Sequence, residues 1–489
     1  MIFVDGVAHH AIRNPQAMAV CIHNADVSYE AFDRNINQVA NLLAARLNPG
    51  ARVAVMVDNQ FTHWLLLLAL GRLGAISVSL DPAKYEMLLE VVRPDAVLTD
   101  RALTGPYSAV EMLVTPAWLK ETLASGNPQP LARLPRLDEP ARIITSSGTT
   151  GRPKKILFTH GDVIRRIKGA YGLYPPGHND RLLSLMGVDT LGGFTAFPRT
   201  WWLGGTACLF SPIPALIIAR NVTGILASPR QMQTLVKRLP AGSRPLPNLS
   251  VTTGGHRMSR ELSLLIRLRL ASTAIVMYGS TEAGAVAAGP LSLLDRDPDV
   301  TGIVLPGHEV EAVDQAGRPV APGVVGEIRV RTQEMCAGYL EDDAATARHF
   351  RDGWFYPGDV GSVSALGELR ILGRVDDVLN AGGVKIAPEV IEEILMTVPG
   401  IDDVGVFSMT DAGTANLWAA VVASGPVDFA AAQALVNRRM ASGNAPLRFV
   451  SVPSIPRNSM GKVQRFELRA QAAALSSSGR PTAPAALQL

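Results

Sequence analysis

The sequence has few cysteines, no runs of one charge and no long apolar stretch, and each scarcity excludes a class of protein. Its three cysteines, Cys21, Cys208 and Cys336, lie far apart and form no CxxC pair, which argues against a disulfide framework and against a zinc motif. Lys and Arg number 46 against 43 for Asp and Glu and are scattered, so we expect no nucleic-acid partner. Unpaired cysteines are typical of a reducing compartment, and we expect a cytoplasmic protein.

The sequence has no apolar segment long enough to span a membrane. The most apolar segment, residues 64–80, is interrupted by Gly71, Arg72 and Gly74 and is shorter than the roughly 20 apolar residues that cross a bilayer. The N-terminal sequence MIFVDGVAHHAIRNP lacks a basic region followed by an apolar core, so we expect neither a signal peptide nor stable membrane insertion. The chain has 489 residues, of which 47% are apolar, and this length and composition indicate a folded protein of about two to four domains.

Short β-branched runs alternate with helical periods over most of the chain. Residues 53–58, 75–80 and 96–100 are predicted as strands, and residues 61–73 as a helix. This alternation indicates an α/β fold of doubly wound sheets, in which ligands bind at the carboxyl ends of strands. Later strands are expected at residues 182–188, 249–255 and 274–279, with a helix from about Ser259 to Leu270.

From about residue 302 the pattern changes to short β segments separated by Gly and Pro turns. Residues 326–332 and 367–374 are examples. The change predicts a β subdomain at about residues 302–374, which completes a large N-terminal domain of residues 1–374.

A smaller α/β domain is expected at residues 375–470. A helix should begin at Pro388, which suits a first helical turn, and strands should follow at residues 404–408 and 417–423. Residues 471–489 are small and polar, and we expect a disordered tail there.

The strongest local signal is ITSSGTTGRPKK at residues 144–155. Hydroxyl residues, glycines and two lysines follow a short apolar strand, so backbone N–H groups, hydroxyls and a cation can converge on phosphate oxygens. No Walker A spacing can be found in it. By itself such a loop is either a phosphate site or an ordinary turn. Its candidate nucleotide contacts are Ser146, Ser147, Gly148, Thr149, Thr150, Gly151 and Lys154.

Four further segments resemble motifs of the adenylate-forming superfamily of acyl-CoA synthetases, peptide-synthetase adenylation domains and luciferases. In the family's order, they are YGSTEAG (278–284), WFYPGDVG (354–361), GRVDDVLNAGGVKIAPEVIEEI (373–394) and PRNSMGKVQR (456–465). The chain is identified as a member, closest in type to stand-alone acyl- or aryl-CoA ligases. The resemblance implies an ATP-dependent ligase that forms an acyl-AMP, releases pyrophosphate and transfers the acyl group to coenzyme A.

The resemblance assigns catalytic roles around the phosphates of ATP. Lys462 matches the lysine that bridges the acyl carboxylate and the α-phosphate, where a mobile ammonium offsets the repulsion between two anions. Glu282 and Thr149 are the implied Mg²⁺ contacts, and Thr150 lies beside the same phosphates.

Ribose and adenine contacts follow from the same resemblance. Asp359 matches the aspartate that accepts hydrogen bonds from both ribose hydroxyls, and Arg374 is a second contact to ribose or phosphate. His256 departs from the small or acidic residue of many relatives, and a structural histidine remains the alternative there. The adenine pocket is expected to involve Gly254, Gly255, His256, Tyr278, Gly279, Ser280 and Thr281.

Asp376 matches the hinge about which the small domain rotates between two half-reactions. The rotation would withdraw Lys462 and bring residues 381–385 to the site for thiol attack. Lys385 is a candidate contact for a coenzyme A phosphate, with a salt-bridged surface lysine as the alternative.

The acid pocket is predicted around the segment before WWLGG. Leu191 stands where amino-acid-activating domains place an aspartate, and a leucine cannot pair with an α-ammonium, so an α-amino acid is not expected. Small or apolar residues at Gly192, Gly193 and 285–287 indicate a hydrophobic aliphatic or aryl acid. Asp189 is either a substrate contact or an N-cap or rim residue. The substrate-binding candidates are Asp189, Leu191, Gly192, Gly254, Gly279 and Ala285.

The thiol acceptor is less defined by the sequence. No carrier-protein domain follows the Lys462 motif, so we expect coenzyme A, with the loading of a separate acyl or peptidyl carrier protein as the main alternative. A nucleotide-binding protein without catalysis is a third hypothesis, disfavoured because Glu282, Asp359, Arg374 and Lys462 are all present. We expect a monomer or homodimer.

Overall fold

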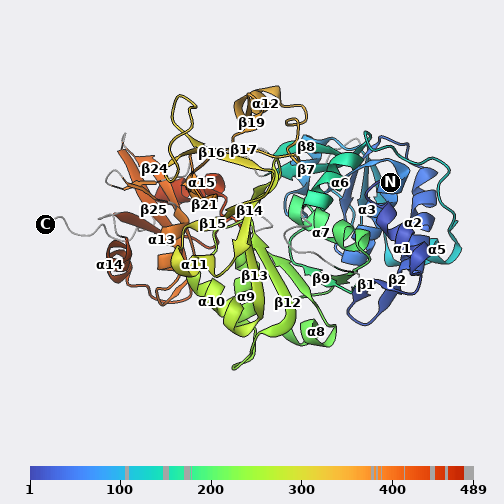
Figure 1. Cartoon of the computed structure of the whole chain (residues 1–489), viewed down its shortest axis with the longest axis horizontal. Helices are drawn as coiled ribbons and strands as arrows, with labels where there is room; N and C mark the ends of the chain where they lie inside the picture. Colours follow the sequence, from blue (N-terminus) through green and yellow to red (C-terminus); the bar gives the residue numbers. More distant parts are fainter. Residues whose placement is uncertain are drawn as a thin grey trace.

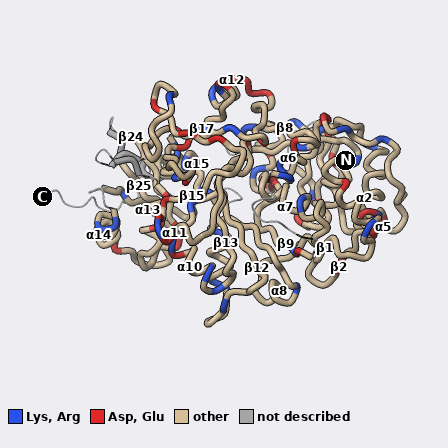
Figure 2. The backbone as a smooth tube through the Cα atoms, in the orientation of Figure 1, with Lys and Arg blue, Asp and Glu red and all other residues tan. Residues whose placement is uncertain are grey.

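The structure is a computed structural model in which a larger N-terminal part and a smaller C-terminal part lie side by side (Figure 1). It describes residues 1–104, 109–146, 153–169, 177, 179–375, 379–381, 384–386, 388–411, 414–440, 446–457 and 461–477. In the described part, no helix is both long and apolar enough to cross a membrane. Basic and acidic residues are interspersed over both parts (Figure 2).

A six-stranded sheet in the order β6-β5-β3-β4-β7-β8 forms one layer of the N-terminal part. All residues of β4 and β5 are buried, as is usual for parallel strands covered on both faces. The predicted strand, helix, strand series before residue 100 is confirmed here. The strands are β3 (Arg52–Met56), β4 (Ile76–Ser79), β5 (Ala96–Thr99), β6 (Val110–Leu113), β7 (Pro140–Ser146) and β8 (Lys154–Thr159).

The described residues up to residue 169 contain six helices. Helix α3 is apolar nearly all round and buried, and Gly74 ends it in the left-handed conformation with φ +77°. Trp64 of α3 stacks on Phe194 of the second layer, so the two layers share one core. The helices are α1 (Asp5–Arg13), α2 (Tyr29–Ala44), α3 (Gln60–Leu73), α4 (Tyr85–Val92), α5 (Pro116–Ser125) and α6 (His160–Gly169).

The second layer is a 15-stranded sheet in which strand β1 and strands β9 to β13 pair in parallel. Strand β9 ends at Ser184, shorter than the predicted 182–188, because the chain turns there toward helix α7. The strands are β1 (Met18–Ile22), β2 (Asp26–Ser28), β9 (Arg181–Ser184), β10 (Thr206–Leu209), β11 (Gly224–Ala227), β12 (Leu246–Gly254) and β13 (Ala271–Ser280). Its helices are α7 (Leu191–Trp202), α8 (Pro214–Ala219), α9 (Pro229–Lys237) and α10 (Arg260–Arg269), the last capped by Ser259 as predicted.

The predicted β-rich segment continues this sheet instead of forming a separate one. Antiparallel pairing passes from β13 to β14, then to β15 and β21. The strands are β14 (Gly284–Pro290), β15 (Val300–Val304), β16 (Glu309–Val313), β17 (Gly326–Arg331), β18 (Phe350–Arg351), β19 (Trp354–Phe355), β20 (Asp359–Val363) and β21 (Glu368–Arg374). Two helices, α11 (Leu293–Arg296) and α12 (Asp343–His349), lie between them.

The C-terminal part has its own three-stranded sheet and core. The prediction that the tail begins at residue 471 is wrong, because helix α15 continues to Ser477. Ala472 of this helix is buried in a cluster that includes Phe407 of β24. Residues 478–489 lie outside the described residues. The elements are β22 (Leu379–Ala381), β23 (Val384–Ile386), α13 (Pro388–Leu395), β24 (Ile401–Asp411), β25 (Thr414–Ala423), α14 (Phe429–Arg439), β26 (Leu447–Ser451) and α15 (Arg465–Ser477).

Candidate active site

A cavity of about 570 Å³ lies where the two parts meet, and residues of both parts line it. The hairpin β13–β14 and strands β20 and β21 contribute from the large part, and Glu389 with the segment 462–467 contributes from the small part. Most described site candidates are brought together on its wall. They are Ser146, Lys154, Asp189, Leu191, Gly192, Gly255, His256, Tyr278, Gly279, Ser280, Thr281, Glu282, Ala285, Asp359, Arg374 and Lys462.

Other candidates are not placed there. Gly254 is buried at the end of β12, and a β-carbon on it would lie 2.8 Å from the backbone oxygen of Met277, inside the sheet. Ser147, Gly148, Thr149, Thr150, Gly151 and Asp376 lie outside the described residues, as does the side chain of Lys385.

Asp359 is held by two residues of the cavity wall. The hydroxyl of Tyr278 donates to its Oδ2 at 2.5 Å, and Nη1 of Arg374 contacts its Oδ1 at 3.2 Å. Asp359 and Arg374 are directly paired across β20 and β21, so the sheet register fixes their distance. Burial, reinforced by the nearby carboxylate, raises the pKa of Tyr278 well above its usual value, so the phenol keeps its proton.

Lys462 enters this part of the cavity from the small domain. It precedes α15, and Gly461 before it has φ +84° and approaches the side chain of Arg230 so closely that a β-carbon would lie 2.7 Å from Cδ. Burial lowers the pKa of Lys462, and the positive charge of Arg374 adds to this, whereas Asp359 and Glu389 oppose it. Lys462 of the small part therefore lines the same cavity as the charged residues Asp359 and Arg374 of the large part.

Glu282 lies at the tip of the β13–β14 hairpin and is 8% exposed. The hydroxyl of Tyr339 donates to its Oε1 at 2.9 Å. Lys154 sits over the ring of Tyr339 at 4.7 Å, and its Nζ lies 2.8 Å from Nε2 of His349. Burial lowers the pKa of Lys154, and Glu282 partly offsets that effect. This arrangement presents a carboxylate and an ammonium to the same space.

His256 lies on the cavity wall next to the small domain. Burial, with the charge of Lys462, lowers the pKa of His256 to about 4, so the imidazole is neutral at pH 7. Its Nε2 has no hydrogen-bond partner among the residues that the structure describes. The placement leaves this atom available to a ligand.

Some of the residues predicted for the acid pocket lie on the cavity wall. Leu191, Gly192 and Ala285 line the cavity, but Gly193 does not, and Val286 and Ala287 are buried in the β core. The expectation that Asp189 caps a helix is wrong, because Thr190 is the N-cap of α7 and accepts a hydrogen bond from the backbone N–H of the helix.

Asp189 instead lies near a fully buried arginine. Arg142 donates to Oγ of Ser79 and to the carbonyl of Val188, both at 2.8 Å, and stacks on Phe194. Burial lowers the pKa of Arg142 to about 9, and the negative charge of Asp189 counteracts the shift. Asp189 thus serves as a counter-charge for Arg142 at the cavity rim.

Lys155 does not line the cavity. Its Nζ donates to the carbonyl of Val91 at 2.9 Å and pairs with Glu341, which also pairs with Arg52 at 2.7 Å. Lys155 therefore connects β8 to the loop before α12, and of these two adjacent lysines Lys154 is the one that lines the cavity.

Three residues that the sequence motifs do not include also line the cavity: Arg166, Glu334 and Tyr339. The sequence does carry a signal for Arg166, because an arginine stands on the otherwise apolar, buried face of α6 with His160, Val163 and Ile167. Glu334 and Tyr339 follow β17 in a loop without periodic pattern, and no local signal marks them.

Among the described residues, three ion pairs connect the two parts, and the pair of Arg257 with Glu393 of α13 is one of them. In the other two, Lys84 contacts Glu467 of α15 at 3.3 Å, and Arg230 contacts Asp403 of β24 at 3.1 Å. Both of these two pairs are partly exposed to solvent, so each is individually weak. Lys462 lines the cavity in this arrangement of the two parts.

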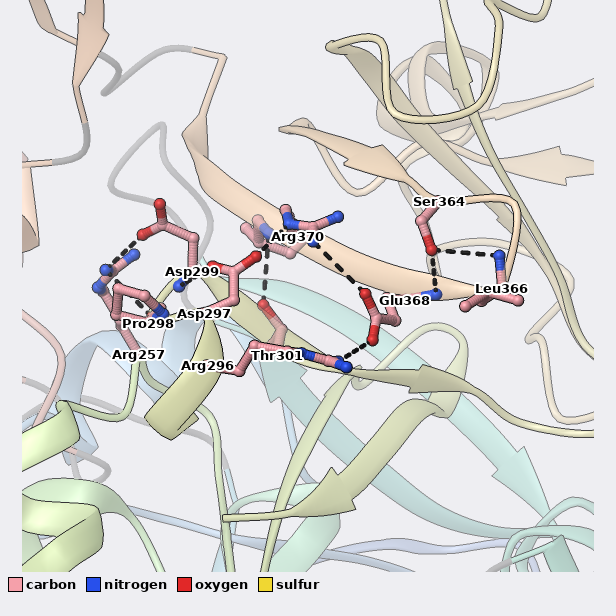
Figure 3. A network of polar contacts seen from close by, with 11 residues as sticks. Arg257, Arg296, Asp297, Pro298, Asp299, Thr301, Ser364, Leu366, Glu368 and Arg370 are labelled. Carbon is pink, nitrogen blue, oxygen red and sulfur yellow. Dashed lines mark hydrogen bonds and ion pairs between the residues drawn. The ribbon is translucent and has the colours of Figure 1, made fainter. Parts of the chain in front are cut away.

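A further charged network supports the strand that carries Arg374. Arg257 contacts Asp299 at 2.6 Å and Glu393 of α13 at 3.7 Å. Figure 3 shows this arginine beside Asp299, and Arg370 of β21 between Asp297 and Glu368. The network joins β15 to β21 next to the start of the small domain.

The chain resembles known proteins along nearly its whole length. Residues 7–340 match the family model described as AMP-binding enzyme. A 4-chlorobenzoate–CoA ligase of Arthrobacter is 29% identical, covering 95% of this chain and 94% of that protein. A fatty acid–[acyl-carrier-protein] ligase of Mycobacterium marinum is 28% identical, covering 97% and 98%. The solved O-succinylbenzoate coenzyme A synthetase of Bacillus subtilis, in complex with ATP and magnesium, has the same fold with a TM-score of 0.82, 22% identity and coverage of 95% and 99%.

Proposed function

The chain belongs to the family of AMP-binding enzymes, and from this premise we propose that it is an ATP-dependent acid–thiol ligase. It adenylates a carboxylic acid, releases pyrophosphate and transfers the acyl group to coenzyme A. The observation that carries the proposal is the convergence of Glu282, Asp359, Arg374 and the small-domain Lys462 on one cavity.

In the proposed adenylation step, a carboxylate oxygen attacks the α-phosphorus of ATP, and the bond from that phosphorus to pyrophosphate breaks. Two like charges about 4 Å apart repel by roughly 4 kcal/mol at an effective dielectric of 20, so a cation is required between them. Lys462 supplies it, since its side chain lines the cavity together with Asp359 and Arg374.

Nucleotide binding falls to the groups around Asp359. Its two carboxylate oxygens suit a ribose diol, and Tyr278 and Arg374 hold that carboxylate in place. The aromatic face of Tyr278 and the imidazole of His256 are the proposed adenine contacts.

Glu282 would hold Mg²⁺ together with phosphate oxygens and Thr149. The residues fit this role, because a buried carboxylate oriented by the Tyr339 hydroxyl is a hard oxygen ligand, and Mg²⁺ is usually bound by one or two carboxylates plus phosphates. When bound, the ion neutralises charge on the phosphates.

Thiol transfer requires Lys462 to leave the cavity. We propose rotation about Asp376, which would exchange Lys462 for the loop of residues 381–385, with Lys385 near a coenzyme A phosphate. The weak ion pairs between the parts are compatible with such a motion.

The acid is proposed to be an aryl or aliphatic carboxylic acid. Leu191, Gly192 and Ala285 give this part of the wall an apolar surface, and Leu191 offers no carboxylate to pair with an α-ammonium. The alternative acceptor, a carrier protein, is supported by the similarity to the Mycobacterium marinum ligase.

Acid-dependent exchange of labelled pyrophosphate into ATP tests the proposal. The assay is run over a panel of aliphatic and aryl acids, and then coenzyme A or carrier proteins are added with thioester formation measured directly. Exchange with at least one acid is expected. Absence of exchange with every acid, combined with intact ATP binding, would favour a nucleotide-binding protein without catalysis.

A further inference from the structure

Arg166 is a buried cation on the cavity wall that the proposed adenylation step does not use. It is 6% exposed, and its guanidinium stacks on Phe158 at 4.5 Å. Nη2 donates to the backbone carbonyl of Glu282 at 3.2 Å, whereas Nε and Nη1 have no hydrogen-bond partner among the described residues. Burying polar N–H groups without acceptors is costly, so these two atoms are suited to a ligand.

Arg166 makes no ion pair with a described residue, although Asp162, Glu334 and Glu282 partly offset the effect of burial on its pKa. In the described part of the chain no carboxylate lies within 4.0 Å of its nitrogens. Glu334, the nearby acid on the cavity wall, is paired with His308 at 3.2 Å, and that pairing offsets the effect of burial and lowers the pKa of Glu334. Arginine stays protonated at neutral pH, so a positive charge remains in this corner of the cavity.

Gly284 keeps the space in front of Arg166 open. A β-carbon at Gly284 would lie 3.3 Å from Nη1 of Arg166 and 3.1 Å from Cβ of Glu334. Any larger residue would therefore fill the gap between these two side chains. The corner lies at the tip of the β13–β14 hairpin, where Gly284 pairs with Ser280, whereas Tyr278, which bonds to Asp359 of β20, lies further along β13.

We propose that Arg166 binds an oxygen acceptor on the acid substrate, remote from the carboxylate that is adenylated. The substrate class is thus a carboxylic acid that carries a second oxygen group, a carboxylate or a hydroxyl. A guanidinium has only donors, so its ligand must be an acceptor, and a buried positive charge binds an anionic oxygen more tightly than a neutral one. This inference rests on the proposed function and specifies its acid.

Pyrophosphate exchange with matched acids tests the inference. Hexanoate, 6-hydroxyhexanoate and adipate form one series, and benzoate, hydroxybenzoates and benzenedicarboxylates form another. Wild-type protein is expected to use the oxygen-bearing members about 10- to 100-fold better in kcat/KM, the range of a charged hydrogen bond. Comparison of the carboxylate and hydroxyl members tells which oxygen group is bound, and either preference supports the role of Arg166.

Variants separate recognition from structure. Arg166→Met keeps the apolar stem and should abolish the preference for oxygen-bearing acids while exchange with the unsubstituted acid persists. Arg166→Lys keeps the charge and should retain part of the preference. A preference that is kept in this variant but lost in Arg166→Met is due to the charge and not to a folding defect. Arg165→Met alters the exposed neighbour on the same helix and should change nothing.

Two outcomes would overturn the inference. One is equal use of substituted and unsubstituted acids by wild-type protein. The other is an equal loss with every acid in Arg166→Met, which would show that Arg166 only supports the carbonyl of Glu282. Both leave the proposed function intact, because exchange still occurs, whereas no exchange with any acid refutes the proposed function itself.

Discussion

The Tyr278 hydroxyl donates a hydrogen bond of 2.5 Å to Oδ2 of Asp359, although 81 residues separate the two in sequence. The contact links the hairpin β13–β14 to strand β20, and Asp359 is in turn paired with Arg374 at the end of β21. Three sequence motifs thus meet at one carboxylate, which makes Asp359 the first residue to test.

Asp359→Ala is expected to raise the KM for ATP by about 10-fold or more, since it removes both acceptor oxygens and leaves Arg374 without that partner. The KM for the acid should change little. Pyrophosphate exchange at varied ATP measures this, with the exposed Asp343→Ala on α12 as the control. An unchanged ATP dependence in Asp359→Ala would place the nucleotide elsewhere.

Lys462→Ala should abolish adenylation but leave thioester formation from supplied acyl-AMP largely intact, because the ammonium is needed only while two anions meet. The two half-reactions are assayed separately, by pyrophosphate exchange and by acyl-AMP consumption in the presence of coenzyme A. Lys237→Ala, an exposed lysine at the end of α9, is the matched control. Equal loss of both half-reactions would contradict the domain-rotation account.

Much of the site could be predicted because its residues lie in contiguous motifs. Asp359, Arg374 and Lys462 each occur in a short recognisable string, and the structure brings all three to one cavity. The fold class was predictable from the alternation of strands and helices, because buried parallel strands are apolar throughout.

Other features depend on contacts between distant segments. Arg166 bonds to the carbonyl of Glu282, 116 residues away, and nothing local marks that partner. Gly254 faces the interior of the sheet because it pairs with Met277 of β13. This pairing cannot be predicted until the register of β12 against β13 is known. The helix through residues 471–477 is alanine-rich and needs packing against the C-terminal sheet, so composition alone suggests a tail.

Glu341 should give the protein a pH-dependent part of its stability. Lys155 and Arg52 lower the pKa of Glu341 from 4.5 to about 2. Because the folded pKa is below the unfolded one, the stabilisation is present above about pH 4.5 and is lost as pH falls toward 2. The difference in Tm between wild type and Glu341→Gln should therefore shrink between these pH values.

Thermal unfolding at pH 7, 5, 4 and 3 measures that difference. Glu121→Gln on the exposed face of α5 controls for the loss of one carboxylate. A Tm difference that stays constant with pH would show that the Glu341 ion pairs contribute nothing to folding. About half of the Glu341 side chain is exposed, so solvent and salt weaken the effect, and low ionic strength gives the clearest result.

Arg230→Ala should slow adenylation without slowing thiol transfer. Arg230 contacts Asp403 of the small domain at 3.1 Å and packs against Gly461, next to Lys462. Asp403 keeps its partner Arg457 at 2.6 Å in the variant, so the small domain retains its internal ion pair and only the contact between domains is removed. A partly exposed pair contributes about 0.2–1 kcal/mol, so adenylation should fall by about 1.5- to 5-fold.

Arg238→Ala, which changes an exposed arginine just after α9, is the control. If thiol transfer from supplied acyl-AMP fell in parallel, the Arg230–Asp403 pair would have to persist in both half-reactions, and the small domain could not rotate away between them.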